Sequence, residues 1–207
     1  MIKVLGRASS INVRKVLWTC AELELEIVHE PWGDPGLPLQ SPAFLAHNPQ
    51  GLVPVLVDGD AVLTESNTIC RYLAARQDRH DLLPASPLLR AQVEQWMDWQ
   101  ATELNNAWRY AFMALVRRSP LHTDEAAIAA SVQEWSRQMS LLDAALAHGG
   151  PYVTGAHFTV ADVVLGLSAQ RWQSAPITHA ELPHVLAYLR RLNERKGFQQ
   201  HGNNGMP

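Results

Sequence analysis

The sequence predicts two fold classes in succession, an α/β unit with a small mixed sheet and then an all-helical unit. Short apolar strands alternate with helical patterns up to about residue 80. Residues 81–87 (DLLPASP) form a linker punctuated by proline, and no strand pattern follows it. We therefore expect an N-terminal unit over residues 1–80, the linker over residues 81–87, and a helical unit over residues 88–207.

The N-terminal unit is expected to contain a four-stranded mixed sheet. A helix that joins two strands implies that those strands are parallel. Asp58-Gly59-Asp60 lies between two apolar runs and predicts a β-hairpin, which supplies an antiparallel edge. The expected strands are residues 3–6, 26–30, 53–57 and 61–64, and the expected helices are residues 13–24 and 66–75, with one turn near 42–46.

The second unit is expected to be built from long helices. Residues 88 to about 118 predict one helix rich in aromatic side chains. Residues 124–148 carry an apolar stripe at helical spacing, with Thr123 as the expected N-cap. Thr159 and Asp162 form a capping-box pattern at the start of the next helix. Residues 182–196 predict the last helix, and the polar residues 199–207 predict a frayed tail.

Composition excludes several classes of protein. The 207 residues include 17 Lys and Arg against 20 Asp and Glu, so the net charge is −3. This disfavours nucleic acid as a partner, and no apolar run approaches the roughly 20 residues that span a bilayer. Cys20 and Cys70 both lie inside predicted helices, where we expect core thiols in a reducing cytoplasm. The nine histidines show no metal-ligand spacing, so we expect no metal.

Val53 and Pro54 stand at the start of a predicted strand. Proline cannot donate a hydrogen bond to a neighbouring strand. If the bond before Pro54 is cis, the backbone of Val53 turns outward, and its N–H and C=O can pair with an extended peptide. The alternative is an edge-strand proline with no ligand, and the segment alone leaves the two interpretations even.

Glu65 and Ser66 join a predicted strand to a predicted helix. Ser66 is a natural N-cap, and this structural explanation is favoured when the segment is taken alone. The functional hypothesis is that free N–H groups at the helix start receive a carboxylate while Glu65 holds an ammonium group. Together they would fit the zwitterionic end of an α-amino acid.

Ser9, Ser10 and Asn12 lie between the first strand and the first helix. One of them is expected to cap the helix. The functional alternative is a hydrogen bond to a bound thiol that favours the thiolate. Lowering a thiol pKa from near 8.5 to about 6.5 requires about 2.7 kcal/mol. A charge-assisted hydrogen bond contributes about 1.5–3 kcal/mol and a helix terminus about 0.3–1 kcal/mol, so one serine at this position suffices.

The aromatic residues between Trp96 and Phe112 suggest an apolar pocket. Most of them are expected to be core, because a large helical unit needs bulky packing. Trp108 and Tyr110 are the residues that we predict to line the pocket.

Four segments together resemble the cytosolic glutathione transferase family, in particular bacterial members near the theta, zeta and beta types. They are residues 9–17 (SSINVRKVL), residues 48–54 (NPQGLVP), Thr64-Glu65-Ser66 and residues 158–162 (FTVAD). Each motif is weak alone, but four in the right order over nearly the whole chain are specific. The resemblance implies a thioredoxin-like N-terminal domain that binds glutathione and an all-helical C-terminal domain.

The resemblance also implies roles for individual residues. The Val53 backbone would pair with the cysteinyl part of glutathione beside cis-Pro54, and Glu65 and Ser66 would hold the γ-glutamyl end. Ser10 matches best the serine that activates the thiol, with Ser9 and Asn12 as rivals. The resemblance implies detoxification chemistry, a cytoplasmic location and a homodimer.

Two departures from the family pattern are visible. Relatives often carry Lys, Gln or His just before the Val-Pro pair to bind the glycyl carboxylate, and Gly51-Leu52 offers no such donor. Asn12 stands where the zeta isomerases have a cysteine, which disfavours isomerase activity. The candidate substitutes for the missing carboxylate donor are Gln50, Gln40, His47 and Trp32.

The resulting prediction is a glutathione S-transferase that stabilises the glutathione thiolate and transfers it to a small apolar electrophile. One alternative is a glutathione-dependent disulfide reductase or peroxidase with Asn12 near the sulfur. Another is a non-catalytic binding module that keeps the fold.

Overall fold

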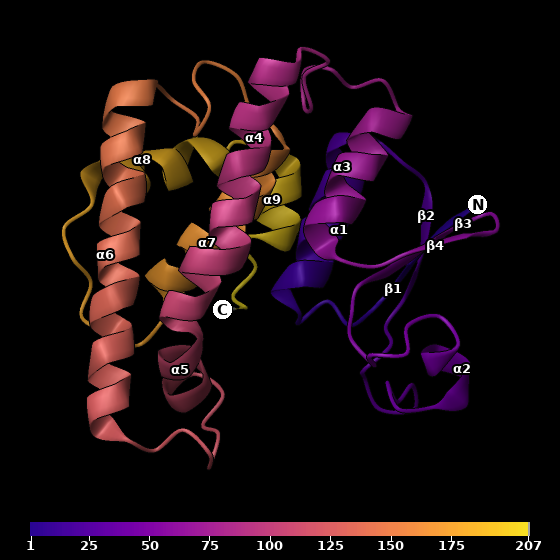
Figure 1. The fold of residues 1–207 in the computed structure, drawn as a ribbon, viewed down its shortest axis with the longest axis horizontal. Helices are drawn as coiled ribbons and strands as arrows, with labels where there is room; N and C mark the ends of the chain where they lie inside the picture. Colours follow the sequence, from indigo (N-terminus) through magenta and orange to yellow (C-terminus); the bar gives the residue numbers. More distant parts are fainter. Residues whose placement is uncertain (207) are drawn as a thin grey trace.

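The computed structural model describes residues 1–206. The last residue of the predicted tail, Pro207, lies outside the described residues. Figure 1 shows the strands at one side of the molecule, α1 and α3 beside them, and the remaining long helices beyond. The first part of the chain contains β1 (Ile2–Leu5), α1 (Ile11–Glu22), β2 (Ile27–Glu30), α2 (Pro42–Leu45), β3 (Val55–Asp58), β4 (Ala61–Leu63) and α3 (Ser66–Arg76). The rest contains α4 (Pro87–Trp99), the π-helix η1 (Gln100–Leu104), α5 (Asn105–Leu115), α6 (Glu125–Gly149), α7 (Val160–Ser174), α8 (Pro183–Leu192) and α9 (Lys196–His201).

The sheet has the strand order β2-β1-β3-β4. β1 runs parallel to β2 and antiparallel to β3, and β3 pairs with β4 in an antiparallel hairpin. The predicted mixed four-stranded sheet is therefore confirmed. The strand predicted over residues 53–57 begins only at Val55, because Pro54 has no N–H to donate to a neighbouring strand.

The long predicted helix of residues 88–118 is divided into three parts. α4 and α5 are joined by the π-helical turn η1, and α5 ends at Leu115. At the turn the Gln100 side chain is buried and accepts a hydrogen bond from Lys15 Nζ at 2.8 Å. Its Nε2 donates to Asn105 Oδ1 at 2.9 Å. These hydrogen bonds lie at the π-helical turn, where the helix widens. Such turns inside α-helices are frequently found at functional sites.

Of the two helix caps predicted in this part of the chain, the cap of α6 differs from the prediction and the cap of α7 agrees with it. α6 begins one residue later than predicted, and its N-cap is Asp124 instead of Thr123. The Asp124 carboxylate accepts hydrogen bonds from the N–H groups of Ala126 at 2.9 Å and Ala127 at 3.2 Å. The capping box at α7 is confirmed, since Asp162 Oδ2 accepts from the Thr159 backbone N–H at 2.8 Å and from its hydroxyl at 3.1 Å.

The prediction of a frayed C-terminal tail is wrong for the described residues. The helix predicted over residues 182–196 ends at Leu192, and a separate helix, α9, follows it. Phe198 in α9 is only 1% exposed and packs against Trp18 of α1, with ring centroids 5.2 Å apart. The tail folds because this contact covers a tryptophan that α1 would otherwise expose to water.

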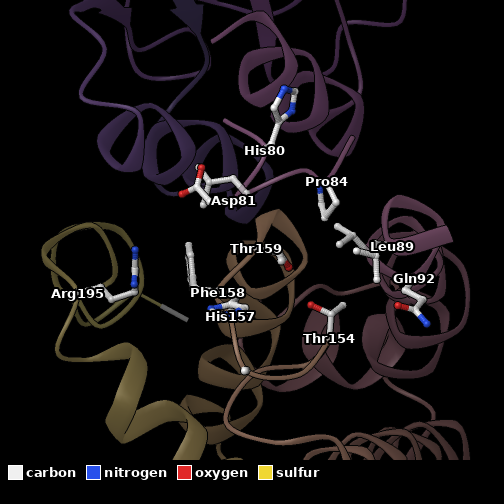
Figure 2. Close-up of a pocket in the computed structure, with 13 residues that line it drawn as sticks. His80, Asp81, Pro84, Leu89, Gln92, Thr154, His157, Phe158, Thr159 and Arg195 are labelled. Carbon is white, nitrogen blue, oxygen red and sulfur yellow. The ribbon is translucent and has the colours of Figure 1, made fainter. Parts of the chain in front are cut away.

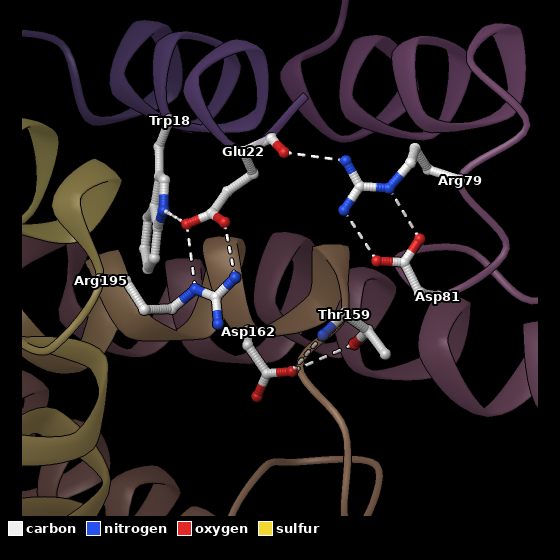
Figure 3. A network of polar contacts seen from close by, with 7 residues as sticks. All are labelled: Trp18, Glu22, Arg79, Asp81, Thr159, Asp162 and Arg195. Carbon is white, nitrogen blue, oxygen red and sulfur yellow. Dashed lines mark hydrogen bonds and ion pairs between the residues drawn. The ribbon is translucent and has the colours of Figure 1, made fainter. Parts of the chain in front are cut away.

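α1 connects the sheet to the helical part. It packs on α3 on one side and on α7 and α9 on the other. Figure 3 shows how the end of α1 is fixed: Glu22 accepts from Arg195 Nη2 at 2.6 Å and from Trp18 Nε1 at 2.8 Å, and its backbone oxygen accepts from Arg79 at 3.0 Å. Arg79 in turn pairs with Asp81 through two hydrogen bonds of 2.8 Å. Because one shared core spans both parts, the start of α1 is held in a fixed position between them.

No helix within residues 1–206 is long and apolar enough to cross a membrane.

Candidate functional site

The segment before β3 forms one wall of the site. The Val53–Pro54 peptide bond is cis. Asn48 is buried and shapes the preceding turn, because its Nδ2 donates to the Leu52 carbonyl at 2.8 Å and its Oδ1 accepts from the Gln50 N–H at 3.1 Å. Within residues 1–206 the backbone N–H and C=O of Val53 make no hydrogen bond. Val53 therefore offers one donor and one acceptor to an extended peptide.

The start of α3 forms the second wall. Glu65 is the N-cap of the helix, whereas Ser66, which the sequence suggested as the cap, is its first residue. Glu65 has φ +66°, a region that costs a non-glycine residue about 1–3 kcal/mol and that clusters at ligand sites. Its side chain is exposed and makes no hydrogen bond to the helix start. The first intrahelical bond runs from Ile69 N–H to Glu65 C=O, so the preceding N–H groups lack a partner within the helix.

These two walls meet around a small cavity of about 120 Å³. It brings together Asn12 from α1 with both predicted peptide-binding segments. The residues that line it are Asn12, Asn48, Gln50, Leu52, Val53, Pro54, Thr64, Glu65 and Ser66. Residues far apart in the sequence thus share one cavity, with the start of α1 at its side.

A second, larger cavity of about 550 Å³ shares Asn12, Leu52 and Val53 with the first. Trp108, Phe112 and Met113 contribute its apolar surface from α5. The other residues that line it are Arg7, Ser10, Ile11, Leu39, Arg109, Arg117, His122 and Arg171. The shared residues place the two cavities next to each other.

The three candidates at the start of α1 occupy different positions. Ser10 is the N-cap of α1, its side chain makes no capping hydrogen bond, and it lines only the larger cavity. Asn12 lines both cavities. Ser9 is half-buried and lines neither of them. Ser10 and Asn12 thus both line the larger cavity, and of the three candidates Asn12 also lines the smaller one.

Four other predicted residues lie outside both cavities. Gln40 packs against Gly51, which has φ +64°. Trp32 packs on Phe44 and donates its indole N–H to Glu30 at 3.0 Å. Tyr110 packs against His122, a residue of the larger cavity, and its hydroxyl accepts from the Asp124 N–H at 3.4 Å. His47 is half-buried and also lines neither cavity.

Sequence reasoning missed the arginines of the larger cavity. Arg109 and Arg117 lie four residues on either side of Met113, and this spacing was an available signal for one face. Arg171 lies on α7, and no local pattern connects it to α5. Its guanidinium lies 4.6 Å from the Trp108 ring centroid and 4.2 Å from that of Phe112. Burial, with the charges of Arg14 and Arg117, lowers the Arg171 pKa to about 9.

The two cysteines are buried, as predicted. Burial is the largest cause that raises the pKa of Cys20 to about 12 and that of Cys70 to about 11. Thiols with such pKa values are protonated at neutral pH and are poor nucleophiles.

A further cavity of about 540 Å³ lies away from these segments. Figure 2 shows it between the linker, the start of α4 and the residues that precede α7. Among its lining residues are His80, Asp81, His157 and Arg195, and none of the predicted site residues lines it. Its charged groups belong in part to the contacts that fix the linker, such as the Arg79–Asp81 pair.

The chain is similar to known proteins over nearly its whole length. Residues 5–81 match the family model described as the N-terminal domain of glutathione S-transferase, and residues 125–191 match the C-terminal domain. The chain is 40% identical over 202 residues to glutathione S-transferase GstB of Escherichia coli, covering 97% of each chain. It is 32% identical to glutathione S-transferase 3 of Zea mays, covering 96% of this chain and 92% of that protein.

The chain is also similar to solved structures of glutathione S-transferases. A theta class glutathione S-transferase of Xanthomonas axonopodis pv. citri, solved with glutathione bound, aligns with a TM-score of 0.92 and 37% identity. The alignment covers 100% of this chain and 99% of that one. The chain belongs to the glutathione S-transferase family. The resemblance that the four sequence motifs indicated is confirmed, as is the thioredoxin-like sheet followed by a helical domain.

Proposed function

We propose that the chain binds glutathione in the small cavity and transfers its sulfur to an electrophile in the larger one. The observation that carries this proposal is the meeting of three separate segments, around Asn12, Val53 and Glu65, at two cavities that share lining residues. The free backbone groups of Val53 suit the cysteinyl part of the tripeptide. Glu65, Ser66 and the open N–H groups of α3 suit the α-amino and α-carboxylate groups of its γ-glutamyl end.

The chemistry follows from the position of the helix start. The glutathione thiol loses its proton to solvent, and its thiolate forms a bond to the electrophilic carbon while the leaving group departs with the bonding electron pair. Ser10 or Asn12 donates a hydrogen bond to the thiolate, with Ser9 as a third candidate. Trp108 packs against the apolar part of the electrophile, and Tyr110 supports His122 from behind. No metal is proposed.

The glycyl carboxylate of glutathione needs a hydrogen-bond donor beside the small cavity. Gln50 is the one predicted substitute that lines the small cavity. Gln40, His47 and Trp32 lie around the same loop and belong to the proposal as residues that shape it.

Glutathione calorimetry tests the proposal directly. We expect wild type to bind glutathione at millimolar concentration or better and Glu65→Gln to weaken binding about tenfold, as loss of a hydrogen bond to a charged group implies. Glu103→Gln, which removes an exposed carboxylate outside both cavities, is the matched control and is expected to bind like wild type. Absence of binding at millimolar glutathione would contradict the proposal.

A second candidate function is glutathione-dependent reduction of disulfides or peroxides. It is favoured by the position of Asn12, which is the only one of the three candidates to line both cavities among the described residues. Faster turnover of a mixed disulfide than of an aryl halide would favour this reaction. Retention of glutathione with no turnover of either would leave a non-catalytic binding module.

We also propose that the protein works in the cytoplasm as a homodimer. Two buried free cysteines suit a reducing compartment. Leu88, which is 70% exposed at the start of α4, and Val62 on β4 provide apolar surface for a second copy. Light scattering on the purified protein should give twice the 23.0 kDa mass of the chain, and a monomer mass would exclude the dimer.

A further inference from the structure

The larger cavity is strongly cationic although the chain is not. Arg7, Arg109, Arg117 and Arg171 line it, and no Asp or Glu is among its lining residues. The whole sequence carries a net charge of −3. A cavity with one sign of charge and low-dielectric walls concentrates ligands of the opposite charge.

Arg171 is the unusual member of this group. It is 4% exposed, and its Nε is buried without a hydrogen-bond partner. Within residues 1–206 it forms no ion pair or hydrogen bond, and its close contacts are the rings of Trp108 and Phe112. By contrast, the half-buried Arg195 pairs with Glu22 through two hydrogen bonds. A buried charge is normally paired, since leaving it without a partner is costly.

The aromatic contacts do not by themselves account for Arg171. A cation–π contact contributes up to about 2 kcal/mol when desolvated, whereas the penalty for burying an ion is several kcal/mol. The neighbouring charges of Arg14 and Arg117 add repulsion. The two rings instead hold the planar guanidinium in one position in the cavity wall, where a ligand can complete its hydrogen bonds.

Glutathione is not expected to pair with Arg171. Its predicted contacts surround the small cavity, and Arg171 does not line that cavity. The larger cavity combines Arg171 with the apolar surfaces of Trp108, Phe112 and Met113. A ligand that uses both features has an apolar body and an anionic group at one end.

We propose that the second substrate is an electrophile that carries a carboxylate, and that Arg171 binds this carboxylate through its guanidinium. This inference rests on the proposed function and names the class of its second substrate. The guanidinium fork matches the two oxygens of a carboxylate. The apolar body then lies on Trp108 and Phe112, with the electrophilic carbon toward Ser10 and Asn12.

Binding without glutathione tests the carboxylate preference independently of catalysis. We expect wild type to bind para-nitrobenzoate at least about tenfold more tightly than the neutral para-nitrobenzamide in calorimetry, given the strength of charge-assisted hydrogen bonds. Arg171→Met should abolish this preference. Arg137→Met, which removes an arginine from the exposed face of α6, should keep it. Equal binding of the two compounds to wild type would overturn the inference.

Turnover provides a second readout with glutathione saturating. A chloronitrobenzoate and the matching chloronitrobenzamide both form a carbon–sulfur bond and release chloride. After division by the uncatalysed rates, wild type should favour the benzoate in kcat/KM, and Arg171→Met should lose that factor without a change in KM for glutathione. If Arg171→Met instead raises the KM for glutathione equally with both compounds, Arg171 serves glutathione and the inference is wrong.

Folding of the variants is checked by circular dichroism and thermal unfolding. If Arg171→Met does not fold, the double variant Arg109→Met/Arg117→Met replaces it, because both side chains are exposed. Its expected effect is a loss of about threefold in the benzoate preference, the size of a screened surface charge effect. An unchanged preference in this folded variant counts against the inference. Failure of the proposed function is seen separately, as absence of glutathione binding in calorimetry.

Discussion

At the scale of single residues, Ser10 and Asn12 are the main candidates for stabilising the sulfur of bound glutathione. Ser10 is the N-cap residue of α1 and its hydroxyl makes no capping hydrogen bond, whereas Asn12, two residues further along, lines both cavities. A hydroxyl at a helix start combines a hydrogen bond with the helix dipole. This combination favours Ser10 for thiolate stabilisation.

Replacing Ser10 by alanine should raise the pH midpoint of thiolate formation on bound glutathione by about one to two units, since a charge-assisted hydrogen bond of 1.5–3 kcal/mol is lost. Thiolate ultraviolet absorbance at increasing pH measures the midpoint. Ser140→Ala, on the exposed face of α6, is the control. An unchanged midpoint in Ser10→Ala would transfer the role to Asn12 or Ser9, whose alanine variants complete the series.

Single residues also show how far sequence reasoning reaches. Val53, Pro54, Glu65 and Ser66 belong to short contiguous motifs, and the family resemblance of these motifs predicted that they share one site; they line one cavity. Arg171 was out of reach, because its position depends on how α7 packs across α5. Gln100 was missed for the same reason, since its partner Lys15 is distant in the sequence.

At the scale of elements, hydrophobic periodicity predicted the long helices but did not predict the short helix α9. α6 has an apolar stripe over many turns, but α9 has only six residues and gives no periodic signal. What decides α9 is a close approach to α1. A Cβ added to Gly197 would clash with Trp18 Cδ1, so only glycine fits beside this buried ring.

Gly197→Ala should therefore destabilise the protein by about 1–3 kcal/mol, the usual cost of overpacking a core. Urea unfolding followed by circular dichroism measures the change in the free energy of unfolding. The control is Gly149→Ala at the end of α6, where an added Cβ meets no atom within 4 Å. A Gly197→Ala variant as stable as wild type would show that α9 does not pack on Trp18 in solution.

At the scale of the whole molecule, a buried polar contact links the sheet part to the helical part. Lys15 of α1 is 1% exposed and donates to Asn67 of α3 at 3.2 Å and to Gln100 of η1 at 2.8 Å. Asn67 extends the link by donating to the Met97 carbonyl at 2.8 Å. Burial is the largest cause that lowers the Lys15 pKa from 10.5 to about 7.

This shift makes stability depend on pH. Between about pH 7 and pH 10.5 the unfolded chain keeps the Lys15 proton and the folded chain has released it, so the contribution of Lys15 to stability rises with pH across this window. The unfolding free energy of wild type minus that of Lys15→Met should increase from pH 7 to pH 10 in denaturant titrations. The control is Lys196→Met, which removes an exposed charge. Its unfolding free energy should change with pH in the same way as that of wild type.

If the difference between wild type and Lys15→Met stays constant with pH, Lys15 keeps its proton in the folded state. The contact would then join the two parts as a charged donor throughout the range.

The net charge of the whole chain also differs in sign from the charge that lines the larger cavity. The sequence suggested an apolar pocket for the second substrate, because aromatic residues are concentrated between Trp96 and Phe112. Folding gathers four arginines into the lining of one cavity, from α5, α7, the loop after β1 and the loop after α5. A net charge averages over the surface and cannot report such a local concentration. The predicted domain limits at residues 81–87 remain a prediction.

The wall shared by the two cavities has a consequence for the finished conjugate. Asn12, Leu52 and Val53 touch both spaces, so a molecule made by joining the two reactants occupies both at once. Such a molecule retains the contacts of each reactant while losing translational freedom only once. It should consequently inhibit the enzyme by competing with either reactant, and its departure is the step that would limit the steady-state rate.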